Sequence, residues 1–179
     1  MSLILKLKDR PRYELRRLAL ALAELCRGIA ASDARTKVRF ALFSRAAAGA
    51  RPLMRETGLG RADILARLET AGACLEQTFF DMELHGLKPD EEAMEALLFT
   101  GRALQLQADF IARPGAADHL AEAARNAAAA SKGLALALRA ARTDGRNFIP
   151  NLKFSRIYSD LEKTVCAVDD CAELLARTL

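Results

Sequence analysis

The chain has 179 residues, of which 51% are hydrophobic and 6% aromatic, and it carries a formal net charge of +4. Good helix formers such as Ala and Leu dominate, and β-branched residues are few, so we expect an all-α protein with a Leu- and Ala-rich core. No apolar run approaches the ~20 residues that a membrane span needs. The start of the chain lacks the apolar core and cleavage site of a signal peptide, so we expect a cytoplasmic protein. The four cysteines show no metal-ligand spacing and are interpreted as small buried hydrophobes.

The charge is distributed unevenly along the chain. Residues 1–67 hold 15 Lys and Arg against 6 Asp and Glu, whereas residues 68–179 hold 12 against 17. A basic first third indicates a face for an acidic partner, which could be a membrane surface, a nucleic acid or another protein. An ordinary solvated surface is the alternative. The candidate docking residues are Arg12, Arg16, Arg17, Arg35, Lys37 and Arg39.

Prolines and glycines divide the chain into helices. Each of the five prolines falls where a helix can begin, end or bend. Ser32 and Asp33 can open the second helix, and Asp90 can open the fourth, with acids in its first turn that suit the helix dipole. The predicted helices are roughly 11–31, 34–50, 61–85, 90–112, 116–142 and 151–178.

Two of these helices have a clear apolar stripe of heptad type, which predicts near-antiparallel packing. A weak internal repeat accompanies the stripes, because residues 75–79 resemble residues 161–165. The sequence therefore predicts a six-helix up-and-down bundle, in a single domain with two three-helix halves at approximately 10–86 and 90–179. The stripe residues are Leu65, Leu68, Gly72, Leu75, Phe79 and Met82 in the third helix and Leu161, Val165, Val168, Ala172, Leu175 and Leu179 in the sixth.

Acidic residues lie beside both stripes. In the third helix, Glu69, Glu76 and Glu83 repeat every seven residues and form a row, which could bind a metal or a basic partner or simply flank the core. In the sixth helix, Glu162 and Asp169 share a side, and Asp170 lies further round. Carboxylates on one face can hold a cation if a second helix supplies partners. The alternative is that these acids are solvated or paired with Arg.

Catalytic motifs are lacking. His85 and His119 lie at a helix end and a helix start, and no nucleophile elbow, phosphate loop, dinucleotide fingerprint or zinc-protease motif is present. We therefore expect no enzymatic activity. A basic helical nucleic-acid-associated regulator is an alternative function that the charge of the first third suggests. Nucleic-acid binding would normally also need a recognition motif or aromatic residues among the basic ones. Dimerisation through the Ala- and Gly-rich fifth helix is a further possibility, as is contact of the apolar and basic N-terminal segment with an anionic membrane.

The final helix carries a family resemblance. Lys153-Phe154, Ile157-Tyr158, Leu161-Glu162 and Asp169-Asp170 follow one another without gaps in an order that resembles the closing helix of the PhoU-like proteins. The similarity is to the branch encoded with Pit-type phosphate transporters, and it covers about 30 residues of this chain. It implies two three-helix bundles in tandem, and a regulatory or accessory role in phosphate transport through docking on a transporter or sensor at the cytoplasmic membrane face.

The chain departs from the family at the metal positions. Family members often bind iron or zinc through Glu-x-x-x-Asp pairs, and this chain contains no such pair, since Cys166 stands four residues after Glu162. Because of this departure, we expect no cofactor of the family type. A residual site for a divalent, iron or zinc ion would use Glu162, Asp169 and Asp170.

Overall fold

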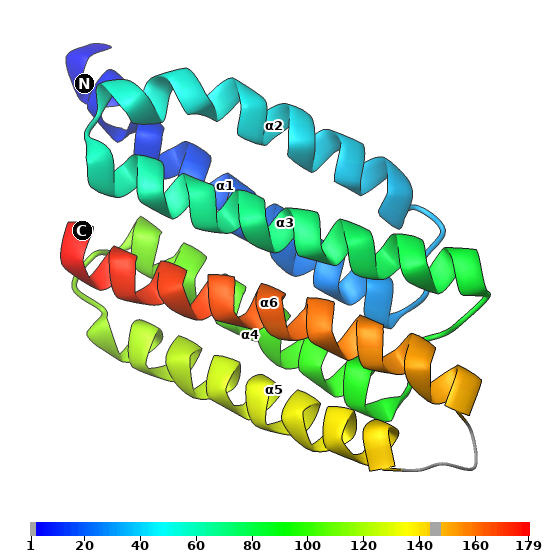
Figure 1. Cartoon of the computed structure of the whole chain (residues 1–179). Coiled ribbons are helices and arrows are strands. Elements are labelled where there is room, and N and C mark those ends of the chain that lie inside the picture. Colours follow the sequence, from blue (N-terminus) through cyan, green and yellow to red (C-terminus); the bar gives the residue numbers. More distant parts are fainter. Residues whose placement is uncertain (1–2, 144–147) are drawn as a thin grey trace.

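The computed structural model describes residues 3–143 and 148–179. The described chain folds into an all-α, six-helix up-and-down bundle, so the predicted fold class is confirmed. Figure 1 shows each helix running antiparallel to the one before it. The helices are α1 (Leu3–Ala30), α2 (Thr36–Glu56), α3 (Leu59–His85), α4 (Glu91–Ala112), α5 (Ala117–Thr143) and α6 (Phe148–Thr178).

Four helices form the centre of the bundle, and two lie at its edges (Figure 1). The first three helices meet the last three mainly through two antiparallel pairs, α1 with α4 and α3 with α6. In the described part of the chain, the extensive contacts of α2 are with α1 and α3, and those of α5 are with α4 and α6. The principal contacts between the two sets of three helices are therefore as extensive as any within them.

Prolines end fewer helices than the sequence suggests. Helix α1 begins at Leu3 instead of residue 11 and includes Pro11. Helix α2 likewise continues through Pro52 to Glu56, instead of ending at residue 50. A proline inside a helix loses one backbone hydrogen bond and strains the preceding turn, and packing against neighbours offsets that cost. Pro150 lies in the first turn of α6, where its missing N–H would have no partner within the helix.

The predicted N-cap of α4 is confirmed, and the predicted N-cap of α2 is wrong. Asp90 caps α4, because its Oδ1 accepts a hydrogen bond from the Ala93 amide at 2.9 Å. Ser32 and Asp33 do not cap α2, whose N-cap is Arg35 without a side-chain bond. Ser32 instead takes the left-handed conformation, with φ of 52°, in the turn after α1. Asp33 accepts from the Arg35 amide at 2.9 Å and so stabilises the turn itself.

The apolar stripes of α3 and α6 form part of the core. Of the twelve stripe positions, all are buried except Phe79 and Leu179, which are half-buried. Gly72 has a specific reason to lack a side chain. A Cβ at this position would lie 2.3 Å from the Phe43 ring, so the glycine lets α2 insert a phenyl ring against α3.

The two outer helices use side chains of different size. The buried side of α5 is mostly alanine (Ala123, Ala127 and Ala130), so α5 lies close to α4 and α6. The buried side of α2 carries Phe40 and Phe43, and α2 contacts α1 and α3 much less extensively. Bulky rings under one outer helix and methyl groups under the other make the bundle asymmetric.

A pair of glycine variants tests this packing. Gly72→Ala should destabilise the protein by about 1 to 2 kcal/mol, because the cost of displacing Phe43 exceeds the gain in helix propensity. Gly133→Ala is the control, since a Cβ there meets no atom within 4 Å, and it should stabilise the protein by about 0.5 to 1 kcal/mol. Urea unfolding measures both values. Equal effects of the two variants would contradict the proposed contact.

Candidate docking groove

A groove runs between α1 and α2, lined by residues of both helices. It consists of two adjoining hollows, of about 510 Å³ and about 420 Å³. Arg17, Leu42 and Ala46 line both hollows, so the groove is continuous. The first hollow is also lined by Leu18, Ala21, Glu24, Arg39 and Phe43, and the second by Arg10, Glu14, Arg45, Gly49 and Leu53.

The first hollow is mainly apolar. Leu18 and Phe43 are buried in its floor, whereas Leu42 leaves 60% of its surface exposed. The charged groups at this end already have partners. Arg39 pairs with Asp33 at 3.1 Å, and Glu24 accepts a hydrogen bond from Arg27. An apolar partner surface could therefore cover this hollow without leaving an uncompensated charge.

The second hollow has an excess of positive charge. Among the described residues that line it, Glu14 is the only acid, and it pairs with Arg17 at 2.7 Å. Arg10 and Arg45 are exposed, and within the described part of the chain neither has a hydrogen-bond or ion-pair partner. The groove thus changes along its length from an apolar end to a basic end.

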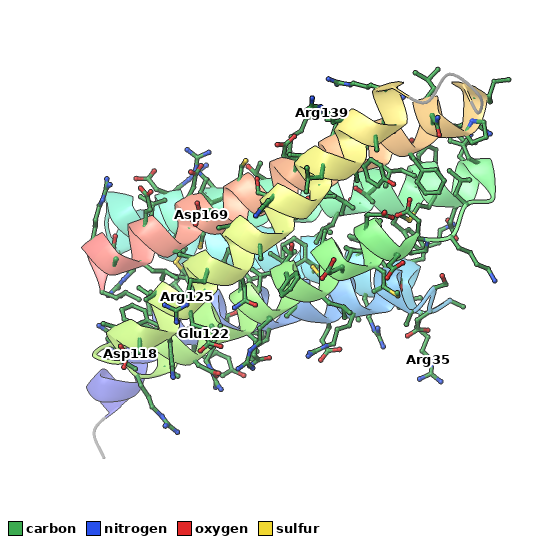
Figure 2. All side chains as sticks on the ribbon, turned by 90° about the horizontal axis from the view of Figure 1, so that it is seen from below. Arg35, Asp118, Glu122, Arg125, Arg139 and Asp169 are labelled. Carbon is green, nitrogen blue, oxygen red and sulfur yellow. The ribbon has the colours of Figure 1, made fainter. Side chains whose placement is uncertain are left out.

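The candidate docking residues are distributed over several faces. Arg17 and Arg39 line the groove. Arg12 and Arg16 lie beside the end of α4, in a hollow that includes Tyr13 and Ile111. Lys37 of α2 lines a hollow together with residues of α3. Arg35 points away from the bundle in Figure 2.

Sequence reasoning missed several groove residues. Leu42 lines both hollows and is 60% exposed, and Val38, four residues earlier and outside the groove lining, is 63% exposed. They lie off the stripe formed by Phe40 and Phe43, and a second apolar stripe on one helix is the signal that could have identified an additional surface. Arg10 and Arg45 carry no such signal, because their proximity depends on how α1 and α2 pack.

The glutamate row of α3 faces α2. Glu69 accepts a hydrogen bond from Arg51 of α2 at 2.8 Å. Glu76 and Glu83 line a hollow with Lys37, also of α2. One glutamate of the row, Glu69, therefore has its basic partner within the same chain.

The acids of α6 do not form a metal site in the described residues. No three His, Cys, Asp or Glu side chains there come close enough together to hold an ion. Asp170 instead lies 3.3 Å from Arg67, so the neighbouring helix supplies a cation where a ligand was expected. The set Glu162, Asp169 and Asp170 is therefore not assembled as ligands in this part of the chain.

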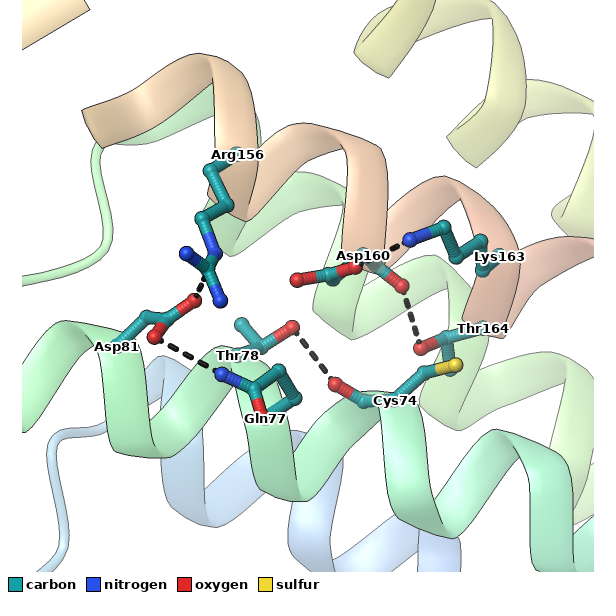
Figure 3. Close-up of polar contacts among 8 residues, drawn as sticks. All are labelled: Cys74, Gln77, Thr78, Asp81, Arg156, Asp160, Lys163 and Thr164. Carbon is teal, nitrogen blue, oxygen red and sulfur yellow. Dashed lines mark hydrogen bonds and ion pairs between the residues drawn. The ribbon is translucent and has the colours of Figure 1, made fainter. Parts of the chain in front are cut away.

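A polar cluster lies between α3 and α6 (Figure 3). Asp81 is 3% exposed, and it accepts from Gln77 at 2.9 Å and pairs with Arg156 at 2.8 Å. Asp160 is 8% exposed and pairs with Lys163 at 2.7 Å. Each buried carboxylate of these pairs has a cation whose side chain is largely exposed, so the cluster is neutralised internally.

The internal repeat coincides with this interface. Thr78 and Thr164 occupy equivalent positions of the repeat, and both are buried. Each donates a hydrogen bond at 3.0 Å to the carbonyl four residues earlier, which satisfies its hydroxyl within its own helix. The shared pattern therefore marks the place where α3 and α6 pack together.

The cysteines differ in exposure. Burial raises the pKa of both the Cys26 and the Cys171 thiol to about 12. Cys166 is exposed on α6, and partial burial, followed by the charges of Glu162, Asp170 and Asp169, raises its pKa. The acids interpreted as metal ligands thus act on a neighbouring thiol.

None of the described helices is long and apolar enough to cross a membrane. No model of a known protein family matches the chain, and the comparison with curated proteins finds no match.

The buried pair of Asp81 and Arg156 can be tested by a double-mutant cycle. Arg156→Ala should destabilise the protein by about 1 to 3 kcal/mol, since it leaves the Asp81 carboxylate buried beside Gln77 alone. Adding Asp81→Ala should recover part of the loss, with a coupling energy of about 1 to 2 kcal/mol. The exposed pair of Glu173 and Arg177 is the control, with coupling below about 0.5 kcal/mol. Equal coupling in both pairs would refute the burial argument.

Thiol labelling tests the pKa directions. In the native protein Cys166 should react with iodoacetamide, whereas Cys26 and Cys171 should react only after unfolding. Because a raised pKa reduces the thiolate fraction, Cys166 should react more slowly near pH 8 than an ordinary thiol. Its rate should rise with pH over a higher pH range than that of an ordinary thiol. Glu162→Gln should increase the rate near pH 8, and Glu173→Gln should leave it nearly unchanged. Peptide mass spectrometry locates the label, and identical rates in both variants would contradict the charge effect.

Proposed function

We propose that this protein is a non-enzymatic accessory or regulatory protein of phosphate transport, which docks on a transporter or sensor at the cytoplasmic membrane face. The observation that carries the docking part is the groove between α1 and α2. It combines an exposed leucine, an apolar floor and two arginines without partners in the described chain. The phosphate-transport part is supported by the resemblance of α6 to the closing helix of PhoU-like proteins.

Other functions have less support. The basic residues lie on several faces, which does not favour a continuous nucleic-acid surface. The alanines Ala123, Ala127 and Ala130 of α5 are buried against α4 and α6, so they serve the bundle itself. The buried carboxylates of Asp81 and Asp160 are each already paired with a cation, which does not favour a catalytic role for them.

Affinity purification from gently solubilised cells tests this function. We expect a phosphate transporter or phosphate sensor to co-purify with the tagged wild-type protein. Leu42→Glu should reduce recovery by about tenfold, because it places a charge in the apolar hollow. Leu136→Glu is the matched control, since Leu136 lies on α5 and is 61% exposed, compared with 60% for Leu42.

Phosphate uptake provides the second measurement. Cells that lack the protein should show altered uptake, and Leu136→Glu but not Leu42→Glu should restore the normal rate. If no phosphate transporter or sensor co-purifies and uptake is the same with and without the protein, the proposed function is wrong.

A further inference from the structure

The shape of the groove limits what can fill it. It lies between two antiparallel helices, and α2 advances 14 residues from Arg39 to Leu53 along it. At a rise of about 1.5 Å per residue this corresponds to roughly 21 Å, or about four turns of a helix. A groove of this length between two helices, with an apolar floor, suits the apolar face of one amphipathic helix.

The charges of the groove define the sign of its occupant. Both acids in it are paired, Glu14 with Arg17 and Glu24 with Arg27. The charges without a partner in the described chain are those of Arg10 and Arg45, and both lie at one end. A complementary helix therefore carries carboxylates near one of its ends and apolar residues along the remainder.

An anionic membrane fits this groove less well. A membrane surface is reached best by a projecting apolar and basic face, whereas the floor residues Leu18 and Phe43 are buried between helices. The carboxylates of Glu14 and Glu24 would also approach the anionic headgroups.

We propose that the occupant of the α1 and α2 groove is an amphipathic helix of a partner protein. Its apolar stripe lies on the exposed Leu42 and the half-buried Ala46 and Leu53, and its acidic end lies over Arg10 and Arg45. This inference rests on the docking part of the proposed function and specifies the chemical class of the partner segment.

Peptide selection tests the inference on the full-length protein. The probe is a displayed library of helical peptides of about 16 residues, with an apolar heptad stripe and randomised polar positions. Selected peptides should be enriched in Asp and Glu at one end relative to the unselected library. Their affinity should fall by about tenfold for Leu42→Glu, and also for the double variant Arg10→Glu and Arg45→Glu. Binding to the charge variant should depend less on salt than binding to wild type.

Control variants on α5 separate groove binding from unspecific attraction. Leu136→Glu and Arg125→Glu change a similarly exposed leucine and an exposed arginine of α5 (Figure 2), and they should leave peptide affinity unchanged. Circular dichroism should show the same helix content for all variants, since every altered side chain is exposed.

Three results would overturn the inference. One is a selection without enrichment of acidic residues, or without any binder. Another is peptide binding that the groove variants leave intact. The third is binding to phosphatidylglycerol vesicles that depends on Arg10 and Arg45 while no selected peptide binds. A phosphate transporter that still co-purifies in these cases would preserve the proposed function and reject only its helical occupant.

Discussion

The contact of Phe43 with Gly72 determines how the edge of this bundle is built. A phenyl ring placed where α3 lacks a Cβ holds α2 against α3. The same helix buries Phe40, whose ring lies 5.7 Å from that of Phe79 on α3, and α2 contacts its neighbours less extensively than α5 does. The groove lies where the side chains of α1 and α2 do not fill the space between these two helices.

Charge neutralisation inside the bundle provides its buried carboxylates with cations. The buried carboxylates of Asp81 and Asp160 are matched by Arg156 and Lys163, and the glutamate row of α3 faces basic side chains of α2. The α3 and α6 interface, which joins the first and last three helices, is therefore both apolar and internally neutral. The pair of Asp81 on α3 and Arg156 on α6 favours one register of these two helices, since a shift of either helix would leave the Asp81 carboxylate buried without its cation.

Parts of the candidate site were accessible from sequence. Arg17 and Arg39 belong to the basic first third, and both line the groove. Charge alone could not separate them from Arg12 and Arg16, which lie beside α4. The ligand set on α6 required a second helix with carboxylates, and helical periodicity specifies only the face on which residues lie. The neighbour at Asp170 is Arg67, which periodicity within one helix does not reveal.

The sequence by itself determined the all-α class, the six helices and their core stripes, because apolar periodicity and helix propensity act over a few neighbouring residues. It also determined the cap of α4, since Asp90 and the Ala93 amide are three residues apart. Only the tertiary structure decided that helices continue through Pro11 and Pro52, because packing against other helices outweighs one lost hydrogen bond. It likewise decided where the groove lies and which charges remain unpaired, since both depend on side chains that meet from helices distant in the chain.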